Sequence, residues 1–325
     1  SVPRGPQMPK AGNLTAWDTC LGWRYPNPRM QAMFALEAMG CTAENIVDQM
    51  DISRGDQDAF ALRSQQKALA AWEAGHFADE IVPIEAPAGR RKTVIIDRDE
   101  GPRADSSLEK LAKLRPAFRQ GGSVTAGNSS TLNDGASALL IATADKAAAL
   151  GLKPMARIVS CASAGVDPEV MGFGPVPATR KALSRAGLTL GDLDLIELNE
   201  AFAAQSLGVI RQLGLDESKV NINGGAIAHR PSPCCPCARI LTTLLFALPR
   251  PRGRYRPPPL SVAGGHGGPT TRRPLCALIP LPPLPPSSHH THLPFFLPFA
   301  CSSNTSHYPP LLNASLIGSS FGRGR

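Results

Sequence analysis

The chain has 325 residues, of which 42% are hydrophobic, and carries a formal net charge of +8. This length and apolar content suffice for two domains of ordinary size. The positive charge comes from residues 229–325, which hold ten arginines and no lysine, aspartate or glutamate. These arginines stand among prolines, without interleaved aromatic residues or a helical pattern, which argues against nucleic-acid binding.

Cysteine usage and apolar runs narrow the protein class further. Eight cysteines in a chain of this length do not form the framework of a small secreted domain, so reduced thiols and an intracellular location are expected. His229 with Cys234, Cys235 and Cys237 could be drawn as a zinc site, but adjacent cysteines do not match usual ligand spacing. A signal peptide is not expected from the opening residues, and prolines and histidines in the run 277–300 argue against a membrane helix there.

Residues 1–125 are expected to form a loop-rich unit that contains helices. Ser53 can cap a helix that runs to Trp72, because its hydroxyl can accept an N–H of the first turn. The apolar residues of this segment form no single stripe, so the helix is expected to pack on two sides or only weakly. Short strands are predicted at 81–84 and 93–96.

A loop of small polar residues follows. The segment from Gly127 to Ser130 and the turn at 133–135 precede an apolar run at 136–142. Such a loop can approach a ligand closely, and Ser130 would offer it a hydroxyl. Turn formation explains the same residues equally well.

From Lys153 onward, strands alternate with helices. Strands are predicted at 156–162, 193–198 and 220–222, and helices at 177–186 and 201–213. This alternation favours a layered α/β fold, in which chemistry collects beyond the carboxyl ends of strands.

Two short segments of this unit are candidates for such chemistry. Asn199 stands where a strand gives way to a helix and could present its amide to a substrate, although a helix cap is the commoner role. Gly224 and Gly225 permit positive φ or a close approach of the backbone to a ligand.

The chain changes character at His229. Residues 229–325 contain 19 of the 32 prolines, and stretches such as Pro280–Pro286 cannot donate regular hydrogen bonds. A disordered Pro-rich tail is predicted for 269–325, with a polyproline ligand for a partner domain as the alternative.

Four segments in order carry a family resemblance. They are VTAGNSSTLNDGAS (124–137), MGFGPVPATRKAL (171–183), LDLIELNEAFAAQ (193–205) and NINGGAIA (221–228). Together they resemble the thiolase family of acyl-CoA acyltransferases. The resemblance implies an α/β fold of the layered αβαβα type, incomplete here. It implies a loop domain at 1–125, a remnant of the N-terminal half at 126–152, and a C-terminal half at 153–268 that is altered from 229.

The resemblance also implies roles for individual residues. Asn199 matches the residue that holds a water beside the thioester oxygen. Residues that match family positions around coenzyme A or the acyl pocket are Met39, Arg103, Phe118, Ala126, Ser130 and Phe202. Coenzyme A and acyl-CoA are the implied substrates, no cofactor is held permanently, and assembly as a homodimer or tetramer is implied.

Three further groups of the family chemistry do not match. The nucleophilic cysteine is expected in a segment that would precede Ser1. Where the resemblance calls for Gly-His-Pro, the chain has Arg230-Pro231-Ser232, and Ser261 stands at the position of the second catalytic cysteine. The resemblance returns in register at Ala238. We therefore hypothesise that residues 229–237 are encoded in a shifted reading frame, which is restored after them.

These observations predict a truncated thiolase-type acyltransferase. The reaction would transfer an acyl group between a 3-oxoacyl-CoA and coenzyme A. The sequences of residues 97–118 and 171–178 are most similar to those of the degradative branch, which includes 3-oxoadipyl-CoA thiolases. Impaired catalysis is expected, because a serine hydroxyl is far less acidic than a thiol. The alternatives are a non-catalytic subunit that binds coenzyme A or a partner, and a Pro-rich interaction protein.

Overall fold

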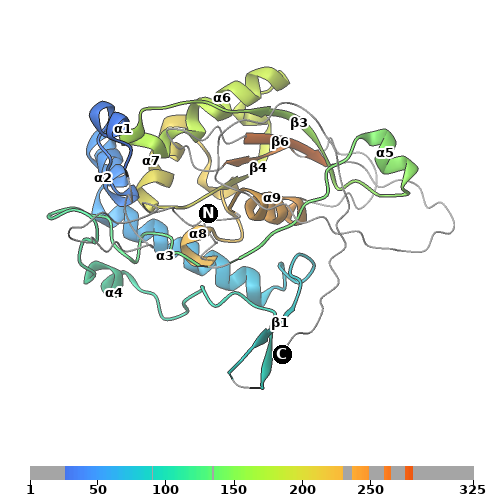
Figure 1. Ribbon diagram of the computed structural model, residues 1–325, viewed down its shortest axis with the longest axis horizontal. Coiled ribbons are helices and arrows are strands. Elements are labelled where there is room, and N and C mark those ends of the chain that lie inside the picture. The colour runs from blue at the N-terminus through green and yellow to red at the C-terminus, as the bar shows by residue number, and fades with distance from the viewer. Residues whose placement is uncertain are drawn as a thin grey trace, which may run out of the picture.

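The centre of the molecule is a four-stranded sheet with the order β3-β6-β5-β4 (Figure 1). The computed structural model describes residues 26–89, 91–133, 135–229, 236–248, 260–264 and 275–280. The strands are β3 (Ala156–Ala162), β4 (Leu193–Leu198), β5 (Leu260–Gly264) and β6 (Leu275–Pro280). β4 and β5 are parallel, whereas β6 runs antiparallel to both of its neighbours.

Helices cover both faces of this sheet. They are α6 (Pro175–Ala186), α7 (Ala203–Leu213) and α9 (Pro236–Ala247), whereas the short helix α8 (Ala226–His229) packs against α3 (Arg54–Glu73). Ile196 and Leu198 of β4 point into the main core with α6 and α7, whereas Leu195 packs against Ile240 and Leu244 of α9. Because successive side chains of a strand point to opposite faces, these contacts place α9 on one face and α6 and α7 on the other. The predicted layered α/β fold is confirmed.

Helix α7 lies between the sheet and a second helical layer. This layer consists of α2 (Met39–Met50) and α3 (Arg54–Glu73), which both contact α7. Every residue from Ala203 to Ile210 is buried, as expected for a helix surrounded on all sides. A Cβ at Gly208 would lie 2.8 Å from the Phe173 ring and 2.9 Å from Ile46, so glycine permits this close packing.

The other elements are short. They are α1 (Pro28–Met33), α4 (Leu108–Ala112), α5 (Ala144–Ala149), the 3-10 turns η1 (Pro168–Phe173), η2 (Leu190–Asp192) and η3 (Glu217–Lys219), and a hairpin of β1 (Ile84–Pro87) and β2 (Thr93–Ile96). None of the helices within the described ranges is long and apolar enough to span a membrane.

The helix predicted after Ser53 is confirmed as α3. The Ser53 hydroxyl accepts the N–H of Asp56 at 3.0 Å, and the helix ends at Glu73. It packs against α4, α7 and α8, so two-sided packing is confirmed and weak packing is wrong. The strands predicted at 93–96, 156–162 and 193–198 are also confirmed.

Two predicted strands are wrong. The first strand of the hairpin is Ile84–Pro87 rather than 81–84, because Ala88 donates to the carbonyl of Lys92 and closes the turn there. The segment 220–222 forms only one bridge, between Val220 and Ile196. The next residue, Asn221, adopts a left-handed φ of 46°, which ends the extended backbone.

Two further boundaries differ from prediction. The helix expected from residue 201 begins at Ala203, because Ala201 and Phe202 pair with the loop 128–130 instead. Strand β6 falls within the range predicted as a disordered tail, so the sheet extends to Pro280. The predicted tail beyond this strand and the altered residues 230–235 lie outside the described residues.

Candidate functional site

The loop from Ser123 to Ser130, here called the 123–130 loop, is anchored by a buried acid. Glu44 of α2 has no exposed surface, and its carboxylate accepts the backbone N–H groups of Ser123 and Val124, each at 2.8 Å. The Ser123 hydroxyl donates to the same carboxylate at 3.2 Å. These bonds fix the start of the loop against the second helical layer.

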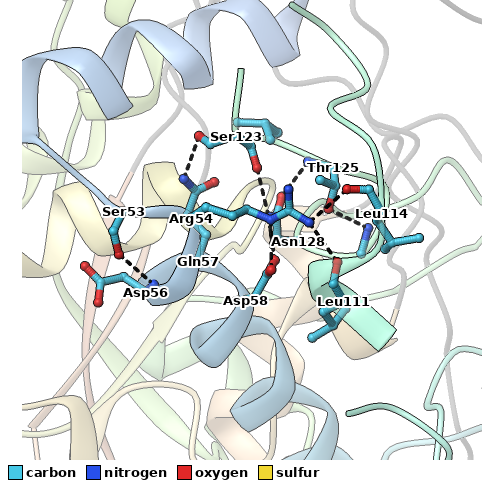
Figure 2. A network of polar contacts seen from close by, with 12 residues as sticks. Ser53, Arg54, Asp56, Gln57, Asp58, Leu111, Leu114, Ser123, Thr125 and Asn128 are labelled. Atoms are coloured by element: carbon cyan, nitrogen blue, oxygen red, sulfur yellow. Dashed lines mark hydrogen bonds and ion pairs between the residues drawn. The ribbon is translucent and has the colours of Figure 1, made fainter. Parts of the chain in front are cut away.

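A second anchor comes from α3 (Figure 2). Arg54 pairs with Asp58 one turn later at 2.8 Å and donates to the carbonyls of Leu111 and Leu114 at 2.7 and 3.0 Å. The arginine therefore donates hydrogen bonds to carbonyls at and just after the end of α4, where helix carbonyls lack partners within the helix. Its partner Asp58 is buried and accepts the amide of Asn128 at 3.0 Å.

Asn128 connects this anchor to the loop itself. Its amide oxygen accepts the N–H of Thr125 at 2.8 Å, and its side chain is fully buried (Figure 2). Its carbonyl accepts the N–H of Ala203, at the start of α7. Ser130 donates its N–H to the carbonyl of Ala201 at 2.8 Å, and Ser129 forms a bridge with Phe202. The 123–130 loop thus lies against the strand-to-helix turn that follows β4.

An aromatic pair lies at the same place. The rings of Phe118 and Phe202 meet edge to face, with centroids 5.8 Å apart. The Cys41 thiol donates to the carbonyl of Phe118 at 3.6 Å, and Gly40 passes directly against the Phe118 ring. Met39 precedes Gly40 at the start of α2, and half of its side chain surface is exposed.

The structure therefore brings together four of the residues predicted for the site, which are Phe118, Ser130, Asn199 and Phe202. Met39 precedes Gly40, which contacts the Phe118 ring. Asn199 is buried, and its carbonyl accepts the N–H of Ala201. Ala126 is exposed on the 123–130 loop.

Two predicted residues lie apart from this group. The backbone N–H of Arg103 donates to Gln65 of α3 at 2.8 Å, and Gln65 in turn donates to the carbonyl of Ile227. Ser261 lies in β5, where its backbone pairs with Leu195 of β4. The residues Arg230 to Ser232, at the expected Gly-His-Pro position, lie outside the described residues.

Sequence reasoning missed a second buried acid beside Asn199. The Glu200 carboxylate accepts the Ser64 hydroxyl at 2.6 Å, the Asn221 amide at 2.8 Å and the Ile227 N–H at 3.3 Å. Burial raises the pKa of Glu200, and these donated hydrogen bonds oppose the rise. The acid therefore joins the turn after β4, helix α3 and the segment 221–229.

Asn221 closes the end of β4. Its amide accepts the N–H of Leu198 at 2.7 Å and donates to the carbonyl of Leu198 at 2.8 Å. One side chain thus satisfies both backbone groups of the last residue of the strand.

Gly224 adopts the positive φ that the sequence allowed for, and it brings the backbone close to α3. Its φ is 80°, and a Cβ would lie 2.7 Å from the backbone atoms of Ala68 and Ser64 in α3. Its N–H donates to the carbonyl of Asn221 at 3.0 Å. Gly225 lies directly against the Glu200 carboxylate. Both glycines are needed for internal packing.

A cluster of ionisable groups surrounds Arg239 of α9. Its guanidinium lies 3.4 Å from Asp99, whose carboxylate is 3.7 Å from Nδ1 of His229. Burial raises the pKa of Glu80 to about 7 and that of Glu197 to about 8, while Arg239 opposes both shifts. Burial also lowers the pKa of His229 to about 3.

His229, weighed as a zinc ligand with Cys234, Cys235 and Cys237, has internal contacts, while Cys234 and Cys235 lie outside the described residues. Nε2 donates to the carbonyl of Asn223 at 2.8 Å, and the ring meets Phe77 edge to face at 4.9 Å. Within the described ranges no group of three or more potential ligands could hold a metal ion.

Comparison with known proteins matches both parts of the chain to one family. Residues 19–145 match the family model for the thiolase N-terminal domain, and residues 152–271 match the thiolase C-terminal domain. An acetyl-CoA acetyltransferase of Pseudomonas aeruginosa is 56% identical over 230 residues, which cover 70% of this chain and 58% of that protein. A beta-ketoadipyl-CoA thiolase of Acinetobacter baylyi is 47% identical over 252 residues, covering 77% and 63%.

A solved structure agrees with these matches. The crystal structure of the Bacillus anthracis acetyl-CoA acetyltransferase superposes with a TM-score of 0.69 at 47% identity, covering 76% of this chain and 61% of that one. The chain spans about three fifths of the length of the curated relatives that it matches.

Proposed function

Because the chain belongs to the thiolase family, we propose that the 123–130 loop and the turn at 199–203 form one wall of a site for coenzyme A. The supporting observation is that Phe118 and Ser130 both contact the turn that follows Asn199, through the Phe202 ring and the Ala201 carbonyl. The proposed reaction class is transfer of an acyl group between a 3-oxoacyl-CoA and coenzyme A.

The wall suits a thioester ligand for three reasons. Phe118 and Phe202 provide apolar surface for the pantetheine arm or the acyl group. The backbone N–H groups of Ser123, Val124 and Thr125 are satisfied within the protein, so little ordering of this part of the loop is required when a ligand arrives. Asn199 stands where a strand leads into α7, whose N-terminus favours developing negative charge.

As a second candidate function, we propose that the chain binds coenzyme A without catalysing thiolysis. Family chemistry needs a base at the Gly-His-Pro position and a thiol at the second cysteine position, and the chain has Arg230-Pro231-Ser232 and Ser261 there. The hydroxyl of serine has a much higher pKa than a thiol, so Ser261 would transfer protons poorly near neutral pH. A non-catalytic subunit that binds coenzyme A is therefore the second candidate function.

The acyl preference within this proposal is that of the degradative branch. The relatives include beta-ketoadipyl-CoA thiolases, and one of them from Escherichia coli is a 3-oxoadipyl-CoA/3-oxo-5,6-dehydrosuberyl-CoA thiolase. We therefore propose a 3-oxoadipyl group as the acyl group to test beside acetoacetyl.

Calorimetry with coenzyme A tests the binding proposal. The chain should bind coenzyme A, and Ser130→Ala should weaken binding, while Ser218→Ala, an exposed position on η3, should leave it unchanged. Absence of binding by the folded chain would contradict the proposed site. Turnover of acetoacetyl-CoA or 3-oxoadipyl-CoA, or a covalently trapped acetyl group, would contradict the proposed loss of catalysis.

A further inference from the structure

A small cavity lies beside helix α3 and the buried acid Glu200. Its walls include Arg63, Lys67, Glu200, Glu217 and Val220. The free space of about 20 Å³ is enough for a group the size of a water molecule or a methyl group. Arg63 and Glu217 form an ion pair at 2.9 Å, and both side chains are about half exposed, so they lie where the cavity meets the solvent.

Lys67 is the nucleophilic side chain in this cavity. Its Nζ donates to the carbonyl of Val220 at 2.9 Å, and the side chain is half-buried. Burial is the largest influence on the pKa of Lys67 and lowers it, while the nearby carboxylate of Glu200 opposes the shift. A lowered pKa leaves a larger share of the amine neutral, and only the neutral amine is a nucleophile.

We propose that Lys67 is a modification site that takes a small acyl group, such as acetyl, from an acyl thioester. The lone pair of the neutral amine attacks the carbonyl carbon of the thioester, so that a C–N bond forms and the C–S bond breaks. The thiolate leaves with the electron pair of that bond, and the proton that the amine nitrogen gives up converts it to a thiol. The products are an N-acyl-lysine and a free thiol, and no further reactant is consumed.

The cavity suits the product as well as the reactant. An acylated Lys67 still has one N–H, which can remain on the carbonyl of Val220. The methyl group of an acetyl group fits the free space, whereas a longer acyl chain would have to pass the Arg63–Glu217 ion pair into the solvent. Acylation also removes the positive charge of Lys67 from the surroundings of Glu200, whose carboxylate connects the turn after β4 to α3 and to the segment 221–229.

Acylation of Lys67 goes beyond the proposed function, because an acyl thioester can reach this cavity from the solvent without binding at the 123–130 loop. The chemistry of the two bonds distinguishes it from thiolysis. The lysine amide resists neutral hydroxylamine, which cleaves the thioester that a catalytic cysteine would form. An acetyl group on Lys67 is therefore no sign of catalytic turnover.

Peptide mass spectrometry of the full chain, incubated with acetyl-CoA, tests the site. At about pH 7.5, Lys67 should be acetylated at least about threefold faster than Lys219, because lowering the pKa by one unit raises the neutral fraction up to about tenfold. Lys219 is the matched control, since it is also half-buried and donates to a backbone carbonyl, that of Leu193, at 2.8 Å. In the urea-unfolded chain the two lysines should react at equal rates. Equal rates in the folded chain, or a preference for Lys67 that persists in urea, would overturn the proposal.

Charge variants at the mouth of the cavity test whether protonation of the amine controls the reaction. Arg63 lowers the pKa of Lys67, whereas Glu197, Glu200 and Glu217 raise it. Arg63→Gln should therefore slow the acetylation of Lys67, and Glu217→Gln should accelerate it, each about twofold. Both variants break the same exposed ion pair, which costs little stability, and circular dichroism confirms that each is folded. Rates that change in the same direction, as simple opening of the mouth would produce, or that stay unchanged in both variants, would contradict the proposed mechanism.

Discussion

The 123–130 loop and the β1–β2 hairpin both lie outside the central sheet, yet they are held in opposite ways. Buried side chains from two helices, Glu44 and Asp58, anchor the loop. The hairpin is held by its own ladder and exposes an apolar face. The loop is therefore held by side chains of the same chain, whereas the apolar face of the hairpin remains exposed.

The largest effect is expected where the anchored region is most tightly packed. Gly224→Ala should lower the free energy of unfolding by about 4 kcal/mol, because a Cβ meets the backbone of α3 at 2.7 Å and φ is 80°. Urea denaturation measures the change. Gly75→Ala is the matched control, since Gly75 has a φ of 72° but open space around its Cβ. Equal losses of stability in the two variants would show that the positive φ, and not the close contact with α3, determines the loss at Gly224.

Removing the acid that anchors the loop should have the next largest effect. Glu44→Ala leaves two buried N–H groups without acceptors, and a loss of about 3 kcal/mol is expected. Glu217→Ala removes an exposed partner of Arg63 and should cost less than about 1 kcal/mol. If the two variants unfold at the same urea concentration, the loop does not depend on its anchor.

The junction between the hairpin base and α9 should make stability depend on pH. Above pH 4.5 the carboxyls of Glu80 and Glu197 ionise in the unfolded chain, but their folded pKa values are about 7 and 8. The free energy of unfolding therefore falls as pH rises, by about 2 kcal/mol between pH 6.5 and 8. The folded pKa of His229 is about 3, so its contribution makes the free energy of unfolding rise with pH, and only below about pH 6.5.

Denaturation at several pH values measures this dependence. Glu80→Gln and Glu197→Gln should each flatten the profile above pH 6.5. A wild-type profile that rises from pH 6.5 to 8 would contradict the assignment of these carboxyls as protonated in the folded chain.

The smallest effect is expected in the hairpin. Ile95 is 58% exposed, so Ile95→Thr should change the free energy of unfolding by no more than about 0.5 kcal/mol. Ile46→Thr, at a fully buried position of α2, is the contrasting variant and should be strongly destabilising. A large loss of stability in the Ile95→Thr variant, measured in dilute protein, would mean that another surface already covers the hairpin.

Local signals predicted much of the fold. The Ser53 cap determined the start of α3, and left-handed glycines at 187 and 214 follow the ends of α6 and α7. The strand-to-helix change around Asn199 was also readable. These features depend on residues within a few positions of each other, so a single sequence reveals them.

The anchors of the site could not be predicted in the same way. Glu44 accepts hydrogen bonds from Ser123 and Val124, which follow it by 79 and 80 positions. Glu200 accepts a hydrogen bond from Ser64, which precedes it by 136 positions. A weak signal was present, because Glu44 falls on the buried side of α2 with Gly40 and Ala43. An acid within an apolar stripe indicates a buried partner, but it does not identify that partner.

The tight turn at Asn223 and Gly224 has a consequence for chemical ageing. An asparagine followed by glycine is prone to deamidation, which starts when the glycine nitrogen attacks the asparagine side chain. Here that nitrogen donates to the carbonyl of Asn221, and the Asn223 side chain is buried with its amide oxygen 3.1 Å from His76. The folded chain should therefore resist this damage. Accumulated aspartate or isoaspartate at position 223, detected by peptide mass spectrometry, would record how long a sample had spent unfolded.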